Sequence, residues 1–196
     1  MTEDPRFEWW NDRYAADDTP WSVGRPQPAV VRLVETGAVE GRVLDVGCGR
    51  GEHARYLGER GHPVVGIDGS ERAIEQARAA TDAADVTFRV ADVLALPADL
   101  GRFDTVLDCG LFHVFADTDT RRRYADSLAG VVDAGGRVHV LAFAEGAPED
   151  WGPTPVPRGG FAAAFEDGWA VRGVSETVYE SAGGEVPAFV ARVERV

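Results

Sequence analysis

Short apolar runs alternate with helix-like segments along most of the chain. The apolar runs are four to six residues long and rich in Val and Leu, which is typical of buried strands. The segments between them show helical spacing of apolar residues, as in the face formed by Ala73, Ile74 and Ala77. The predicted strands lie at residues 42–46, 64–67, 86–90, 103–107 and 138–143. Strands that alternate with helices indicate an α/β domain with a mostly parallel sheet and helices on both of its faces.

The last part of the chain departs from this alternation. Residues 169–179 and 188–193 resemble two strands joined around Gly183-Gly184, which favours an antiparallel C-terminal hairpin. A Pro-rich loop at residues 148–157 precedes them, and Gly135-Gly136 is expected to turn the chain into the strand at 138–143.

A glycine-rich loop follows the first predicted strand. Gly47, Gly49 and Gly51 occupy alternate positions, so the backbone there can turn sharply and approach a ligand closely. The next helix would add its free N–H groups. The spacing differs from the dinucleotide pattern G-x-G-x-x-G, whose third glycine would replace Glu52, and no G-K-[ST] follows. The loop therefore predicts a nucleoside-like ligand and makes a nicotinamide-dependent oxidoreductase the less favoured enzyme class.

Carboxylates stand at or just beyond the ends of four successive predicted strands. They are Asp45, Asp68, Asp92 and Asp108. Ligands of open α/β sheets bind at this edge, where an acidic residue after the second strand suits the hydroxyls of a ribose. One such Asp alone is commonly a helix cap. Four of them beside the glycine loop indicate a ligand site, and Asp45 favours a ligand with a cationic end.

The N-terminal segment is unusually rich in aromatic residues. Trp9, Trp10 and Trp21 lie in a stretch that has no core of its own, ahead of the sequence T-P-W-S-V-G-R-P-Q-P. The rings either complete the core of the sheet or form a lid that covers a ligand and shapes an apolar pocket. Both interpretations stay open for Trp9 and Trp10, whereas Pro20 and Gly24 favour the lid for Trp21.

These motifs resemble a known family. The [DE]-x-G-x-G-x-G pattern of residues 45–51 and the segment 66–70 resemble motifs I and II of the class I S-adenosylmethionine (SAM) methyltransferases. The pattern T-P-W-x-x-G-x-P-x-P and residues 104–115 are similar to thiopurine, thiol/halide and tellurite-resistance methyltransferases, and to those that methylate heterocyclic toxins. Ser22 departs from the acidic residue often found after that Trp.

The resemblance implies a Rossmann-like seven-stranded sheet, with residues 1–36 as a helical lid and residues 37–196 as the SAM-binding domain. It also implies SAM as cofactor, S-adenosylhomocysteine (SAH) as product, and a small, mostly apolar acceptor such as a thiol or a heterocyclic N or O. A non-catalytic SAM-binding module is the alternative outside the enzymes.

The resemblance also assigns site residues. For the cofactor it implies Trp21, Asp45, Gly47, Cys48, Gly49, Gly51, Asp68, Gly69, Ser70, Asp92, Val93 and Asp108. For the acceptor it implies Trp9, Trp10, Arg25, Gly110, Phe112, His113 and Trp151.

Besides Trp9 and Trp10, three of these side chains have competing interpretations. Trp151 either forms a wall of the pocket or lies in a loop that folds away from it. His113, just past a strand end, is the candidate general base, or equally a histidine satisfied by a backbone carbonyl. Arg25 could reach a carboxylate of the ligand or form an ion pair with Asp17 or Asp18.

The amino-acid composition limits the kinds of partner that the protein can bind. The 196-residue chain has 33 acidic and 20 basic residues, a net charge of -13, and every basic residue is Arg. This balance argues against nucleic acid or an anionic membrane as partner. The two cysteines lack metal-ligand spacing, so we expect no metal and reduced thiols in a cytoplasmic protein. The acidic excess without Lys favours a halophilic source, although GC-rich codon usage would also remove Lys.

Overall fold

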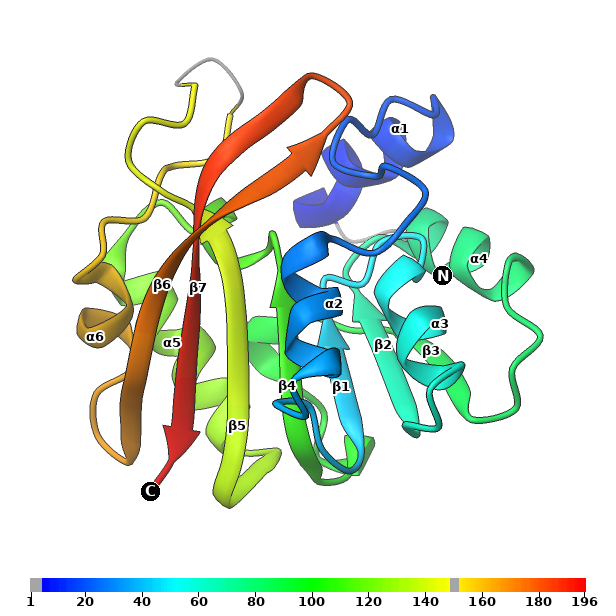
Figure 1. The fold of residues 1–196 in the computed structure, drawn as a ribbon. Coiled ribbons are helices and arrows are strands. Elements are labelled where there is room, and N and C mark those ends of the chain that lie inside the picture. The colour runs from blue at the N-terminus through cyan, green and yellow to red at the C-terminus, as the bar shows by residue number, and fades with distance from the viewer. Residues whose placement is uncertain (1–4, 149–151) are drawn as a thin grey trace.

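The computed structural model describes residues 5–148 and 152–196. The described strands form one sheet in the order β3-β2-β1-β4-β5-β7-β6, shown in Figure 1. The strands are β1 (Val43–Val46), β2 (Val64–Asp68), β3 (Val86–Val90), β4 (Phe103–Cys109), β5 (Val132–Phe143), β6 (Trp169–Ser181) and β7 (Gly184–Arg195). Neighbours from β3 to β5 are parallel, whereas β7 pairs antiparallel with both β5 and β6. The predicted mostly parallel sheet and its C-terminal hairpin are confirmed.

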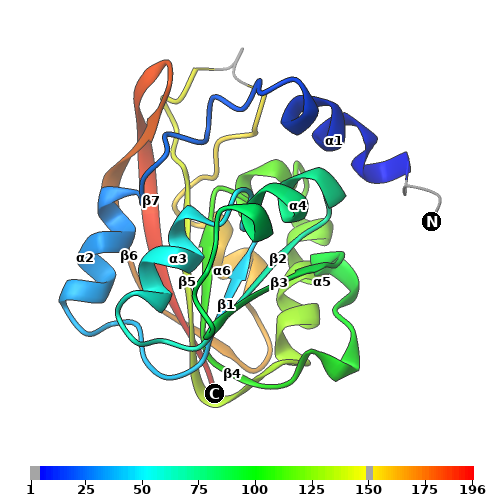
Figure 2. The same cartoon turned by 90° about the vertical axis from the view of Figure 1, so that its right-hand side faces the viewer.

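Helices cover both faces of this sheet, as Figures 1 and 2 show. The helices α2 (Pro28–Glu35), α3 (Glu52–Gly58) and α4 (Glu71–Ala79) contribute Val30, Leu57 and Ile74 to one apolar cluster. The helices α5 (Thr118–Ala129) and α6 (Gly160–Ala164) contribute Leu128 and Phe161 to a second cluster. Short 3-10 helices connect the elements: η1 (Pro5–Phe7), η2 (Val93–Ala95), η3 (Ala98–Leu100) and η4 (Phe112–Val114).

The Gly135-Gly136 prediction was wrong in one respect. These glycines lie inside β5, not in a turn before it. The pairing of β5 with β4 jumps from Phe103–Val132 to Thr105–Arg137 across them. The extra residues form a bulge, which glycine tolerates well because it reaches positive φ; Gly135 has φ +87°.

The N-terminal residues divide into two parts. Helix α2 belongs to the core, since Val30 and Leu33 are buried against the sheet. Helix α1 (Glu8–Ala15) lies over the carboxyl ends of the strands, as Figure 2 shows. Its Asn11 Oδ1 accepts from Ser70 Oγ at 2.7 Å and from the Arg72 N–H at 3.3 Å. We use the term lid segment for residues 5–26, which lie ahead of α2. No helix within 5–148 and 152–196 is both long and apolar enough to cross a membrane.

Candidate active site

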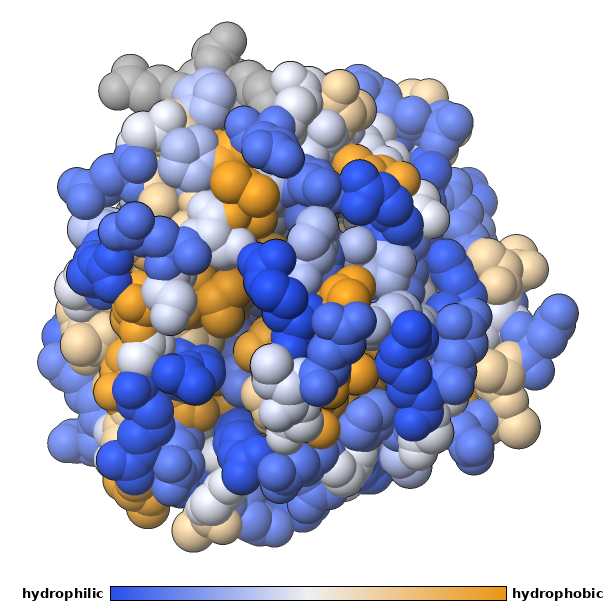
Figure 3. Space-filling view, in the orientation of Figure 1, coloured by the Kyte–Doolittle hydropathy of each residue, from blue (hydrophilic) through white to orange (hydrophobic). Residues whose placement is uncertain are grey.

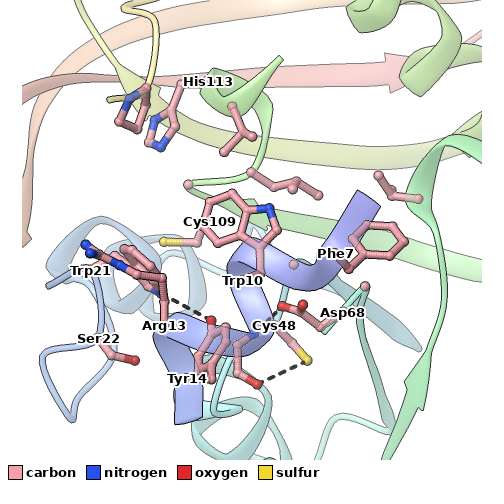
Figure 4. A pocket seen from close by; sticks show the side chains of 18 of the residues that line it. Phe7, Trp10, Arg13, Tyr14, Trp21, Ser22, Cys48, Asp68, Cys109 and His113 are labelled. Atoms are coloured by element: carbon pink, nitrogen blue, oxygen red, sulfur yellow. Dashed lines mark hydrogen bonds between the residues drawn. The ribbon is translucent and has the colours of Figure 1, made fainter. Parts of the chain in front are cut away.

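A cavity of about 690 Å³ opens at the carboxyl ends of the central strands, beneath α1. This volume lies within the range of roughly 300–1,000 Å³ that small-molecule sites occupy. Its walls come from the loops after β1 and β2, from η2 and η4, from the lid segment and from the β6–β7 hairpin. Figure 4 shows part of this lining.

Twelve of the predicted site residues line this cavity. They are Trp9, Trp10, Trp21, Gly47, Cys48, Gly49, Asp68, Gly69, Asp92, Val93, Gly110 and His113. The predicted Trp151 lies outside the described residues.

Two carboxylates mark one end of the cavity. Asp68 Oδ2 accepts from the Gly49 N–H at 3.0 Å, and its Oδ1 accepts from the Ser70 N–H at 2.8 Å. Burial raises the pKa of Asp68, and these N–H groups oppose that shift because they stabilise the carboxylate. Asp92 Oδ1 accepts from the Leu94 N–H at 2.9 Å, while its Oδ2 pairs with Arg6.

Glycine lets the lid segment approach this end closely. A Cβ on Gly49, which has φ +54°, would come within 2.8 Å of the Tyr14 hydroxyl. A Cβ on Gly69 would lie 2.3 Å from the Phe7 ring. The small residues of the two loops therefore make room for the aromatic side chains above them.

The lid rings contact one another over the cavity. The ring centroids of Trp10 and Trp21 are 5.4 Å apart, and Trp9 lies 4.6 Å from Trp10. The Trp21 Nε1–H donates to the Tyr14 hydroxyl at 3.1 Å. The Arg13 guanidinium lies 5.1 Å from the Trp9 ring and 5.9 Å from the Trp21 ring, a cation–π arrangement. The aromatic side chains therefore form one roof, and the hydrogen bonds of Asn11 with Ser70 and Arg72 join its helix to the body.

The opposite end of the cavity is aromatic. Phe143, at the end of β5, lies 4.1 Å from the His113 ring and 5.3 Å from the Tyr179 ring. The Tyr179 hydroxyl donates to the Trp21 carbonyl at 3.5 Å, so the hairpin also contacts the lid segment. Sequence reasoning missed Phe143 and Tyr179, because both looked like ordinary strand residues and no local motif marks them.

His113 is not arranged as a general base, which corrects the prediction. Its Nδ1 accepts from the Phe143 N–H at 3.0 Å, so the proton of the neutral ring is on Nε2. Burial lowers the pKa of His113 to about 3, and the charge of Arg121 lowers it further. The ring therefore stays neutral near pH 7 with no free basic nitrogen. The alternative was also wrong, because the partner is an N–H and not a carbonyl.

Asp108 and Phe112 have structural positions. Asp108 does not line the cavity: its Oδ2 accepts from the Tyr124 hydroxyl at 2.8 Å, and its Oδ1 accepts from the Leu111 N–H at 2.9 Å. Phe112 is fully buried and stacks on Phe161 with 5.4 Å between centroids. Asp108 was predicted at the site from its place at a strand end, and Phe112 from the family resemblance, but both face the core below the cavity.

Ser70, Gly51 and Arg25 also lie outside the cavity lining. Ser70 caps α4 by accepting from the Ala73 N–H at 3.1 Å. A Cβ on Gly51 would meet the Phe88 ring at 2.6 Å, so this glycine serves the contact between α3 and the sheet. Arg25 pairs with Glu180 at 2.7 Å, and not with Asp17 or Asp18.

Asp45 is buried behind the glycine loop and does not line the cavity either. No described residue forms a hydrogen bond with its Oδ2. Burial raises its pKa well above the usual range, and the nearby charge of Glu52 raises it further.

Comparisons with known proteins agree with this geometry. A methyltransferase-domain family model matches residues 43–136. The chain is 38% identical over 161 residues to 2-heptyl-1-hydroxyquinolin-4(1H)-one methyltransferase of Mycobacteroides abscessus, covering 80% of this chain and 70% of that one. It is 31% identical over 140 residues to probable thiol methyltransferase 2 of Arabidopsis thaliana, covering 68% and 61%.

The chain belongs to the class I SAM-dependent methyltransferases.

A solved structure from the same family has the same fold throughout. It concerns the conversion of a disulfide bond into a thioacetal group during echinomycin biosynthesis, and it matches with a TM-score of 0.86 and 32% identity. The match covers 97% of this chain and 92% of that chain. The resemblance inferred from the motifs is confirmed, and the alternative assignment as a nicotinamide-dependent oxidoreductase is wrong.

The cavity suits the SAM that this methyltransferase uses. Asp68 offers a carboxylate at the predicted ribose position, and Gly47, Gly49 and Gly69 keep the walls beside it free of side chains. The Glu52 carboxylate lines the same region, and Asp45 Oδ2, which no described residue bonds, lies behind it. A ligand with a sulfonium and an ammonium group fits such an acidic end, since buried carboxylates favour cationic partners.

Proposed function

We propose that this methyltransferase transfers a methyl group to a small, mostly apolar acceptor, at a thiol or at a heterocyclic N or O. The observation that carries the proposal is the division of the cavity into two ends. Asp68 lies at one end, with Asp92 next to the Ala91 that bonds to it, and His113 lies across the cavity with Phe143 and Tyr179 (Figure 4). An aromatic end of this kind favours flat or apolar molecules.

The relatives support the same class of acceptor. One is named for a quinolinone that carries an N-hydroxyl group and a heptyl chain, and another for thiols. Both kinds of molecule combine an apolar body with one acidic atom. The cavity of this chain offers an apolar wall of matching character.

We assign the cofactor to the acidic end. In this assignment Asp68 binds the ribose hydroxyls, and Asp92 with Val93 contacts the adenine. When bound, SAM supplies a methyl carbon on a positively charged sulfur, which is already a strong electrophile. The residues of this chain then need only align the acceptor behind that carbon and exclude water.

The lid segment supplies the exclusion of water. Trp10 and Trp21 line the cavity from above, and Trp9 extends the aromatic roof outward with 55% of its surface exposed. In this proposal the roof separates the reacting pair from solvent during transfer.

Transfer of labelled methyl from SAM to a panel of thiols, hydroxyquinolines and phenols tests the proposal. A second arm fills the acceptor end by Val114→Trp, since Val114 lines the cavity. We expect the variant to lose transfer at least tenfold with unchanged SAM affinity. The control is Val178→Trp, on an exposed position of β6 away from the cavity. Transfer to no member of the panel by the wild type contradicts the proposal.

A further inference from the structure

The aromatic end of the cavity holds a hydrogen-bond donor that has no partner among residues 5–148 and 152–196. The Phe143 N–H occupies His113 Nδ1, which leaves the proton on Nε2. Nothing in the described part of the chain accepts that proton. Figure 4 shows His113 across the cavity from Asp68, so its ring lies at the acceptor end and not at the cofactor end.

The titratable groups around His113 offer no base. Burial raises the pKa values of the Cys109 thiol and the Tyr179 hydroxyl well above their usual range, so both stay protonated. The positive guanidinium of Arg121 on α5 disfavours protonation of the imidazole to its positively charged form. Two carboxylates, Asp108 and Glu52, influence both Cys109 and Tyr179. Asp108 is held in the core by the Tyr124 hydroxyl and the Leu111 N–H. Glu52 lines the cavity, and its Oε1 accepts from the Ser22 hydroxyl at 3.0 Å.

We infer that the acceptor enters as an anion and that His113 is a positioning residue that donates its Nε2–H to it. This inference rests on the proposed function and adds the substrate class: thiols, N-hydroxy heterocycles and phenols that ionise by themselves near neutral pH. A buried anion is costly without a donor, and a charge-assisted hydrogen bond from Nε2 offsets part of that cost.

The step balances without a base. The acceptor loses its proton to solvent before it binds. Its lone pair forms the new bond to the methyl carbon, and the electron pair of the broken carbon–sulfur bond stays on sulfur. The negative acceptor and the positive sulfur both become neutral, while His113 keeps its proton throughout.

Two substitutions separate the two ring nitrogens. His113→Asn keeps an oxygen near the Nδ1 position that can accept from Phe143, but it removes the donor at Nε2. His113→Gln keeps a donor near Nε2 and loses the Nδ1 acceptor. The first variant should fold normally and fail to position the anion, whereas the second should bind the anion and lose stability.

Binding of 4-nitrothiophenol to the protein–SAH complex gives a readout that does not depend on turnover. Its thiol and thiolate absorb at different wavelengths, so the bound form is seen directly. We expect bound thiolate, and we expect His113→Asn to weaken its binding about 10- to 100-fold, the factor provided by a hydrogen bond to a charged group. The S-methyl form of the probe is the control, since its affinity should not change. Bound neutral thiol, or an equal loss for both probes, overturns the inference.

The pH dependence of kcat/KM over a series of substituted thiophenols is the second test. We expect each profile to rise to a plateau at the pKa of the thiol used, so that the profiles shift along the series. If kcat/KM instead rises at the same pH for every thiophenol, an ionising group of the enzyme such as Glu52 acts as the base. That result overturns the inference, while the proposed function stands. Absence of any transfer in the whole series contradicts the proposed function as well.

Discussion

The backbone N–H of Gly49 donates to Asp68 Oδ2 over 3.0 Å and joins the loop after β1 to the end of β2. The Ser70 N–H holds the other carboxylate oxygen at 2.8 Å. The direction of this carboxylate is therefore fixed by the backbone of the two loops that line the cavity. A carboxylate that is already fixed loses little conformational entropy of its own when a ligand binds.

Asp68→Ala should weaken SAM binding without unfolding the protein. Each hydrogen bond from a ligand hydroxyl to a carboxylate contributes roughly 1.5–3 kcal/mol, so we expect a loss of at least tenfold in affinity. Titration calorimetry measures the affinity, and thermal melting checks the fold. Asp99→Ala is the matched control, because Asp99 is an exposed carboxylate paired with Arg89. Unchanged SAM affinity in folded Asp68→Ala contradicts the assignment.

Removal of residues 1–25 should cost far more methyl transfer than global stability. The two large apolar clusters of the sheet take their described members from Val30 onward, so the deletion leaves them intact. Of the deleted residues, Trp21 packs beside a smaller third cluster that contains Tyr179. Urea unfolding and a methyl-transfer assay compare the two effects.

Hydrogen exchange provides the independent check on the lid. We expect SAH to increase protection of residues 5–26, since ligand contact would add to the bonds of Asn11 with Ser70 and Arg72, which join the segment to α4. A deletion that unfolds the protein, together with strong protection that SAH does not change, would mean that the segment is core.

Tyr124→Phe should destabilise the protein more at pH 8 than at pH 5. Burial raises the pKa of Asp108 to about 6, above the ordinary value of about 3.9 in the unfolded chain. Stability from this raised pKa is therefore complete below about pH 4, declines as pH rises to about 6, and is constant above that.

The Tyr124 hydroxyl lowers the pKa of Asp108, so its loss extends the decline to higher pH. We expect a change in unfolding free energy of about 1 kcal/mol at pH 5 and roughly 1.5–3 kcal/mol at pH 8, measured by urea denaturation. The control is Tyr56→Phe, because no described group bonds to the buried Tyr56 hydroxyl. Equal losses at the two pH values for Tyr124→Phe would be evidence against a charged Asp108.

Concentrated KCl should raise the melting temperature steeply. With a net charge of -13, the surface carboxylates repel one another in dilute buffer. Hydrophilic side chains cover most of the face shown in Figure 3. In molar salt the screening length falls to about 3 Å, which removes this repulsion. A parallel series in sucrose, which stabilises by exclusion without screening, isolates the charge effect. A melting temperature that stays flat in KCl would leave codon usage as the explanation for the missing Lys.

The sequence by itself determined the sheet, the glycine loop and the carboxylate beside it. These features are local. Gly47, Gly49 and Gly51 adopt φ +66°, +54° and +76°, which side chains other than glycine rarely allow. The alternation of strand and helix likewise follows from the spacing of apolar residues within each segment, so it needed no knowledge of distant contacts. Asp68 lies at the end of β2 and lines the cavity, as its position in that pattern predicted.

Only the tertiary structure decided which of the similar residues face the ligand site. Asp108 ends a strand as Asp68 does, yet Tyr124, sixteen residues away, holds it in the core. His113 became a donor because the N–H of Phe143, thirty residues away, occupies its other nitrogen. Tyr179 reached the cavity because the C-terminal hairpin pairs with β5. The direction of a side chain and the partner of a polar atom depend on the register and packing of elements distant in the sequence. The residues next to that side chain in the sequence therefore cannot predict either one.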